Sequence, residues 1–174
     1  MRDLFLLLFI CSEILTLCGL VYYWNPNLLT LSQVFGNYNE KIYFFFLVNL
    51  FGMMCALAYE YTFHDFISFS LFLFLAVTYI LLLWISEDVQ DTLRFKSHVI
   101  LSALSLSFSV LYILYHAVRR RDLLLYVFFF LSLSLFYSIV SKTVYAFKNG
   151  LSVSEILLEE VTMLLLCVIT VVRR

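Results

Sequence analysis

The chain has 174 residues, of which 64% are hydrophobic and only 13% are charged, and its formal net charge is −1. Because a soluble domain is about a quarter charged and less than half apolar, this composition excludes a water-soluble globule. One proline and four glycines also argue against a turn-rich all-β fold, and the near-neutral charge indicates no partnership with nucleic acid. We therefore expect a membrane protein.

Six apolar segments are each long enough to cross about 30 Å of hydrocarbon as a helix. They cover residues 4–23, 42–59, 66–86, 98–118, 123–141 and 152–172. The first is interpreted as a retained span because Glu13 interrupts it and no clear cleavage site follows. The strands of a transmembrane barrel would alternate strictly over about 10 residues, and the apolar runs do not. The sequence predicts an all-α fold, with residues 1–174 forming one six-helix transmembrane domain.

Lysine and arginine in the short connections indicate the orientation of such a bundle. Six arginines would share one side, namely Arg2, residues 119–121 and residues 173–174. The other side would hold Lys41, Arg94, Lys96, Lys142 and Lys148. We expect both termini in the cytosol. The connections 24–41, 87–97 and 142–151 would then face the lumen or the exterior.

Three of the predicted helices carry polar residues at helical spacing. Segment 98–118 has the clearest stripe, with successive spacings of 4, 3, 4, 3 and 4: His98, Ser102, Ser105, Ser109, Tyr112 and His116. Similar stripes follow in the next two helices: Ser134, Ser138, Ser141 and Tyr145, then Ser152, Glu155, Glu159 and Thr162. We expect all three stripes to face the interior of the bundle. Small polar residues there favour either close helix packing or a binding cavity, in which Ser102, Ser105 and Ser138 would contact the substrate.

Glu159 lies about two turns inside the last helix, where an ionised carboxylate is costly. We expect its side chain to face the two preceding helices, near Ser138 or Ser105, and burial would favour its neutral form. Intramembrane acids are functional candidates by default, so Glu159 is a candidate substrate-binding residue, with a structural hydrogen bond as the alternative. Glu160 points elsewhere and is the weaker candidate, and Glu13 presents the same choice of roles.

The connection after residue 86 places Glu87 and Asp88 a few residues before His98. With Asp91, this makes three acids and an imidazole at one membrane face, which could act as a general acid/base set or hold a divalent cation, although acids in a loop are usually only solvated. His98 and His116 would be about 27 Å apart along one helix, which argues against a three-histidine zinc centre. No metal site and no cofactor are expected.

Three stretches together resemble the post-GPI-attachment-to-proteins factor two family, within the broader FRAG/DRAM/Sfk group of six-span proteins. The first runs Asn-Pro-Asn-Leu-Leu-Thr-Leu-Ser over residues 25–32, followed by Phe-Gly-Asn-Tyr at 35–38. The second is Ser-Glu-Asp at 86–88 with His98, and the third is Ile-Leu-Leu-Glu at 156–159. Their order fits from about Asn25 to Thr170. Thr30 and Glu160 depart from the family pattern, which has a proline and an aromatic residue there.

The resemblance implies a Golgi or endoplasmic reticulum protein that takes part in re-acylation of the lyso-form of a GPI lipid with a saturated chain. In that setting Glu87, Asp88 and His98 would be catalytic, and Asn27 and Ser32 would join Glu159 and the serines in binding substrate. The partners would be membrane lipids, including a GPI-anchored lipid, and a membrane protein partner. Whether the chain would itself be the acyltransferase or an accessory factor is left open.

Two other functions stay open at this point. The chain would equally suit a non-enzymatic scaffold, lipid-binding module or complex subunit, as the DRAM-type relatives suggest through lipid organisation and autophagy. A small transporter or channel is the third interpretation, although inverted halves and broken helices are not evident.

Overall fold

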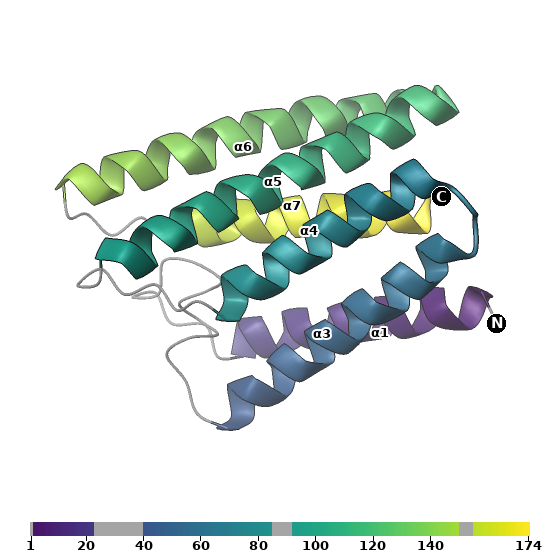
Figure 1. The fold of residues 1–174 in the computed structure, drawn as a ribbon, viewed down its shortest axis with the longest axis horizontal. Helices are drawn as coiled ribbons and strands as arrows, with labels where there is room; N and C mark the ends of the chain where they lie inside the picture. The colour runs from purple at the N-terminus through teal and green to yellow at the C-terminus, as the bar shows by residue number, and fades with distance from the viewer. Residues whose placement is uncertain (1, 23–39, 85–91, 150–154) are drawn as a thin grey trace.

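A computed structural model describes residues 2–22, 40–84, 92–149 and 155–174. Within these ranges the chain forms six helices and no strands (Figure 1). The helices are α1 (Arg2–Tyr22), α3 (Glu40–Tyr61), α4 (Phe66–Trp84), α5 (Thr92–Arg120), α6 (Leu123–Asn149) and α7 (Glu155–Val172). The predicted all-α fold is therefore confirmed. Four predicted site residues lie outside the described residues: Asn27, Ser32, Glu87 and Asp88.

Both termini lie at the same end of the molecule as the α3–α4 and α5–α6 turns (Figure 1). The two turns share one local design. His64 and Arg121 each adopt a φ of 52°, a conformation that commonly ends a helix. The aspartate that follows caps the next helix: Asp65 accepts the N–H of Ser68 at 3.3 Å, and Asp122 accepts that of Leu124 at 2.9 Å.

Three of the helices contain stretches that are long and apolar enough to cross a membrane: Phe44–Tyr61, Lys96–Arg120 and Leu123–Tyr145. A fourth apolar stretch, Phe66–Leu82, is shorter. This finding concerns only the described part of the chain. The number of spans and the side on which the termini lie stay predictions.

Two predicted connections are partly wrong. Helix α5 begins at Thr92, inside the expected connection 87–97, and α6 continues to Asn149, through most of the expected connection 142–151. The predicted spans 98–118 and 123–141 stop next to charged residues, such as Lys96 and Lys142, and charges are costly in hydrocarbon. Lysine and arginine are nevertheless good helix formers, so a charge ends the apolar stretch without ending the helix.

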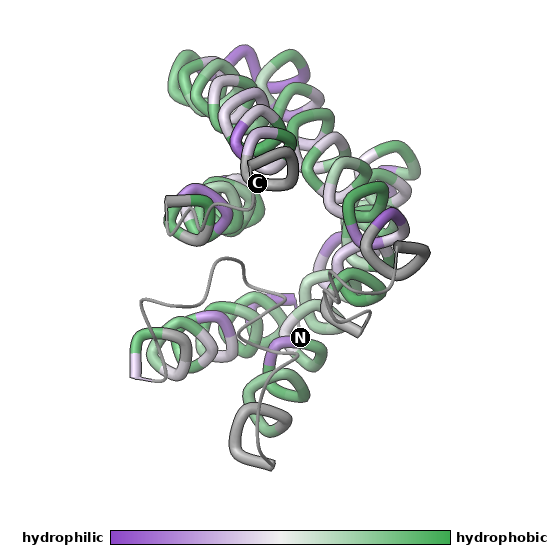
Figure 2. The backbone as a smooth tube through the Cα atoms, turned by 90° about the vertical axis from the view of Figure 1, so that its left-hand side faces the viewer, coloured by the Kyte–Doolittle hydropathy of each residue, from purple (hydrophilic) through white to green (hydrophobic). Residues whose placement is uncertain are grey.

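The helices pack in chain order from α1 to α7, and α7 also packs against α5. The buried core includes Phe9, Phe72, Tyr112, Ile113 and Leu166. Hydrophobic residues, in green, predominate in the helices, with polar residues, in purple, among them (Figure 2). Gly52 permits a close approach of α3 to α1, because a Cβ there would lie 2.0 Å from the Ser12 hydroxyl oxygen and 3.0 Å from its Cβ.

The structure confirms the predicted orientation of the polar stripe on α5 and contradicts that of the stripe on α6. The stripe of α5 faces the interior as predicted, since His98, Ser105, Ser109, Tyr112 and His116 are all buried. The prediction for α6 is wrong, because its Ser134, Ser141 and Tyr145 are exposed and only Ser138 is partly buried. The interior face of α6 instead follows a seven-residue repeat of buried side chains at Leu125, Ser132 and Ile139, which one stripe of a helix can present.

Candidate lipid pocket

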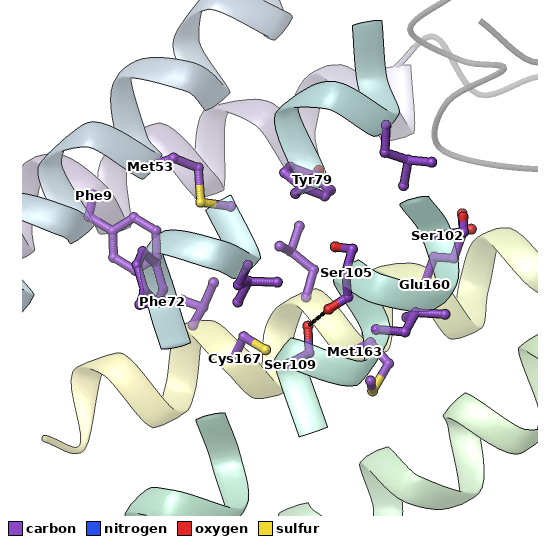
Figure 3. Close-up of a pocket in the computed structure, with 15 residues that line it drawn as sticks. Phe9, Met53, Phe72, Tyr79, Ser102, Ser105, Ser109, Glu160, Met163 and Cys167 are labelled. Atoms are coloured by element: carbon purple, nitrogen blue, oxygen red, sulfur yellow. Dashed lines mark hydrogen bonds between the residues drawn. The ribbon is translucent and has the colours of Figure 1, made fainter. Parts of the chain in front are cut away.

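A narrow pocket lies among α1, α3, α4, α5 and α7 (Figure 3). About 660 Å³ of space separates its lining atoms, including the part open to the surroundings, but only about 50 Å³ admits the centre of a water-sized group. The small second volume indicates a narrow space between the side chains, which we call the slot. Most of its lining is apolar, with Phe9, Met53, Phe72, Leu75, Leu82, Leu106, Met163, Leu164, Cys167 and Val168.

Tyr79 is one of the residues that line this apolar slot, and its hydroxyl is buried. Its side chain is only 7% exposed and lines the pocket (Figure 3). Its hydroxyl has no hydrogen-bond partner among the described residues. A buried hydroxyl without a partner costs free energy, and such a group calls for an explanation. A ligand with an oxygen acceptor at this depth would supply the missing partner.

Helix α5 contributes further hydroxyls to the pocket. Two predicted substrate-binding residues, Ser102 and Ser105, line it together with Ser109 (Figure 3). The Ser109 hydroxyl donates to the backbone oxygen of Ser105 at 3.0 Å. The third predicted serine, Ser138, does not line this pocket.

The structure distinguishes the two adjacent acids of α7. Glu160 lines the pocket, together with Met163, Leu164 and Cys167 from the same face of the helix (Figure 3). Glu159 does not line it, since consecutive helical residues differ by about 100° around the axis. The weaker of the two candidates therefore reaches the pocket.

Glu159 faces α6, and its predicted contact with Ser138 is confirmed. The Ser138 hydroxyl donates to its Oε1 at 2.8 Å, and Lys142 Nζ lies 2.7 Å from the same oxygen. Lys142 supplies a counter-charge for this carboxylate. The arrangement joins α6 to α7 and is consistent with the structural alternative.

His98, the predicted catalytic base, is 4% exposed on the same face of α5 as Ser102. The two residues are separated by one helical turn, or about 6 Å along the axis. His98 is therefore near the pocket without lining it. Its predicted companions Glu87 and Asp88 lie outside the described residues, as do Asn27 and Ser32, so their expected roles stay predictions.

A second buried polar group lies at the end that carries both termini, and sequence reasoning missed its centre, Glu60. The Glu60 carboxylate accepts the hydroxyls of Ser68 at 2.7 Å and Tyr112 at 2.6 Å, and it pairs with Arg174. Ser68 Oγ also lies 2.9 Å from His116 Nε2. Because the Ser68 proton goes to Glu60, His116 donates to Ser68 through Nε2.

Asp65 extends this group toward the surface. It accepts the Tyr115 hydroxyl at 2.8 Å and pairs with Arg119 and with Arg174, whose Nη2 lies 3.3 Å away. Burial alone would raise the pKa of Asp65, but the hydrogen bonds from Tyr115 and Ser68 and the charge of Arg119 hold it below its ordinary value of 3.8. Asp65 is therefore ionised at neutral pH.

The missed cluster had a signal in the sequence. Glu60 falls at the end of an otherwise apolar helical segment, which marks an acid as a candidate, and Arg119 and Arg174 belong to the arginine groups used for orientation. Nothing in the sequence showed that these arginines would form ion pairs with Glu60 and Asp65 around the α3–α4 connection.

The surroundings of Glu13 favour a structural role, because it is buried beside an asparagine of the neighbouring helix. It is 2% exposed on α1, and Asn49 Nδ2 of α3 lies 3.4 and 3.5 Å from its two carboxylate oxygens. Thr16, its predicted neighbour, instead donates to the backbone oxygen of Ser12 at 2.9 Å.

Comparison with protein-family models, curated proteins and solved structures found no match to this chain.

Proposed function

We propose that the protein is a multi-pass membrane protein that binds the acyl chain of a lipid in the pocket between α4, α5 and α7. Three sufficiently long apolar stretches support the membrane setting. Large apolar side chains on the outer faces also support it, since Phe66, Leu123 and Tyr137 are each about four-fifths exposed. Such side chains are stable against lipid and unfavourable against water.

The proposed topology has six spans, with both termini in the cytosol. The shared position of the termini supports an even number of crossings (Figure 1). Residues 119–121 lie at that same end, and an excess of arginine favours the cytosolic side.

The observation that carries the proposed ligand is the unpartnered hydroxyl of Tyr79, a residue that lines a narrow apolar slot. A hydrocarbon chain fits a narrow slot with an apolar lining, whereas water needs several polar partners. The ester or hydroxyl oxygens of a glycerolipid would accept from Tyr79 and from Ser102 or Ser105. A lipid therefore satisfies both the shape and the polarity of the pocket.

The proposed role is lipid remodelling in the Golgi or endoplasmic reticulum. The resemblance noted in the sequence suggests the reaction, which is re-acylation of a lyso-GPI lipid. The glycerol oxygen would form an ester bond with the carbonyl carbon of an acyl thioester, while the thiolate leaves. His98, one turn from Ser102, would take the hydroxyl proton and return it to the thiolate.

Lipids that co-purify with the protein test the binding claim. Ser105→Leu adds bulk inside the slot, and Ser134→Leu adds the same bulk on the exposed face of α6 as a control. We expect mass spectrometry to find a stoichiometric lipid with the parent chain and the control, and several-fold less with Ser105→Leu. Equal retention by both variants would contradict binding in this pocket.

Cells that lack their own GPI-remodelling factor test the reaction. The parent chain should restore saturated GPI lipids, and His98→Ala should fail while reaching the membrane in normal amount. His64→Ala is the control because His64 is exposed. If His98→Ala rescues fully, His98 is not the base; if the parent chain binds lipid but never rescues, the non-enzymatic lipid-binding function replaces the proposed one.

A further inference from the structure

A second pocket lies at the end that carries both termini, and the lipid-remodelling proposal does not use it. About 170 Å³ of it admits the centre of a water-sized group. One water needs about 10–15 Å³ by that measure, so the pocket accepts a considerably larger polar group. It is lined by Phe63, Asp65, His116, Arg119, Arg120 and Arg174, and we call it the basic pocket.

The charges of the basic pocket favour an anion. Three arginines line it, and among the described side chains two carboxylates pair with them, Asp65 in the lining and Glu60 behind Arg174. With His116 neutral, these five acidic and basic side chains sum to one positive charge. Burial lowers the pKa of Arg174 to about 10, which leaves its guanidinium charged at neutral pH.

The arginines also retain donors for a ligand. Arg119 uses Nη1 for both Asp65 and Tyr115, and a guanidinium carries five N–H donors. Arg120 is exposed and forms no hydrogen bond or ion pair with another described residue. Arg174 is held in place from both sides, because its guanidinium carbon lies 4.2 Å from the centre of the Phe63 ring and its nitrogens contact Glu60 and Asp65.

We propose that the basic pocket binds the phosphate group of an anionic membrane lipid. Arginine guanidinium groups match phosphate oxygens in geometry as well as charge. Free phosphate has the same chemistry, but the surroundings favour a lipid. Phe66 and Val118 adjoin pocket residues in the chain and expose apolar side chains, so a bound headgroup would leave its acyl chains against an apolar surface. On the proposed topology this end faces the cytosolic leaflet, which is rich in anionic lipid.

A titration of the full-length protein in neutral detergent tests the site. The ligands are dioleoyl phosphatidic acid, dioleoylglycerol, which lacks the phosphate, and inorganic phosphate. Binding is followed by native mass spectrometry and by the shift in Tm. Arg120→Gln removes a lining charge, and Arg121→Gln removes the neighbouring exposed charge, which does not line the pocket.

We expect phosphatidic acid to bind and dioleoylglycerol not to bind at this site. Arg120→Gln should weaken the binding of phosphatidic acid about tenfold, the effect of one charge-assisted hydrogen bond, and Arg121→Gln should change it less than twofold. Binding of inorganic phosphate with the same dependence on Arg120 would keep the phosphate site and make its source a free anion. Equal effects of the two variants on phosphatidic acid, or binding of dioleoylglycerol that Arg120→Gln weakens to the same extent, would overturn the proposal.

Discussion

At the end that carries both termini, the Glu60 carboxylate accepts hydrogen bonds from Ser68 and Tyr112 and pairs with Arg174. In the apolar pocket that Tyr79 lines, the equally enclosed hydroxyl of Tyr79 has no partner among the described residues. Both regions bury tyrosines against apolar helices, yet only one satisfies them. A saturated polar group needs no ligand to be stable, whereas an unsatisfied one is stabilised by a ligand that completes it. On the proposed function, the contrast gives the Glu60 carboxylate a structural role and makes the Tyr79 hydroxyl the candidate for ligand binding.

The largest expected effect comes from changing Glu60, the central carboxylate of the buried polar group at the end that carries both termini. Glu60→Gln keeps the shape of the side chain but leaves the Arg174 charge without its main partner in a buried site. We expect the free energy of unfolding to fall by about 3–5 kcal/mol, seen as a large drop in Tm in detergent.

Glu159→Gln provides the matched comparison, because the Glu159–Lys142 pair is partly exposed, with side chains 17% and 27% accessible. Its cost should be clearly smaller than that of Glu60→Gln, because glutamine can still accept the Ser138 hydrogen bond and Lys142 is not fully enclosed. If Glu60→Gln and Glu159→Gln lower the free energy of unfolding equally, the buried Glu60 site and the partly exposed Glu159 site do not differ in the way described.

A smaller effect is expected from one hydroxyl of the saturated region. Tyr112→Phe removes the 2.6 Å hydrogen bond to Glu60 and leaves that carboxylate one donor short. We expect the protein to lose about 1–2 kcal/mol, measured by thermal unfolding. A variant as stable as the parent chain would show that Glu60 is not dependent on this donor.

The pH dependence of stability tests the role of Asp65. Since its folded pKa lies below the ordinary 3.8, its contribution is complete above the unfolded value and is lost as the pH falls through the folded one. We expect Asp65→Asn to lower Tm at neutral pH and to flatten the decline of Tm between about pH 4 and more acidic conditions. A decline of the same steepness in Asp65→Asn would assign it to other acids, such as Asp122, whose pKa is also lowered, chiefly by its hydrogen bond with Arg173.

The helices and the inward face of α5 were predictable because apolar length and 3.6-residue spacing are local properties of the sequence. The face of α6 was not, since its orientation depends on Leu125 and Ile139 packing against other helices. The same limit applied to the last helix. Spacing alone identified Glu159 as the residue on a polar stripe, but only the position of α7 against α5 shows that Glu160 lines the pocket. Glu60 and Arg174 are 114 positions apart by their residue numbers, so their pairing depends on the tertiary fold.

Tyr79→Phe tests the central contrast most directly, through its stability with and without lipid. The substitution removes a hydroxyl that has no partner in the empty pocket, so the delipidated variant should equal the parent chain or exceed it by up to about 1 kcal/mol. Added lyso-phospholipid should raise the Tm of the parent chain and raise that of Tyr79→Phe clearly less. If Tyr79→Phe is less stable than the parent chain without lipid, or gains as much from lipid, the Tyr79 hydroxyl does not bind the ligand of this pocket.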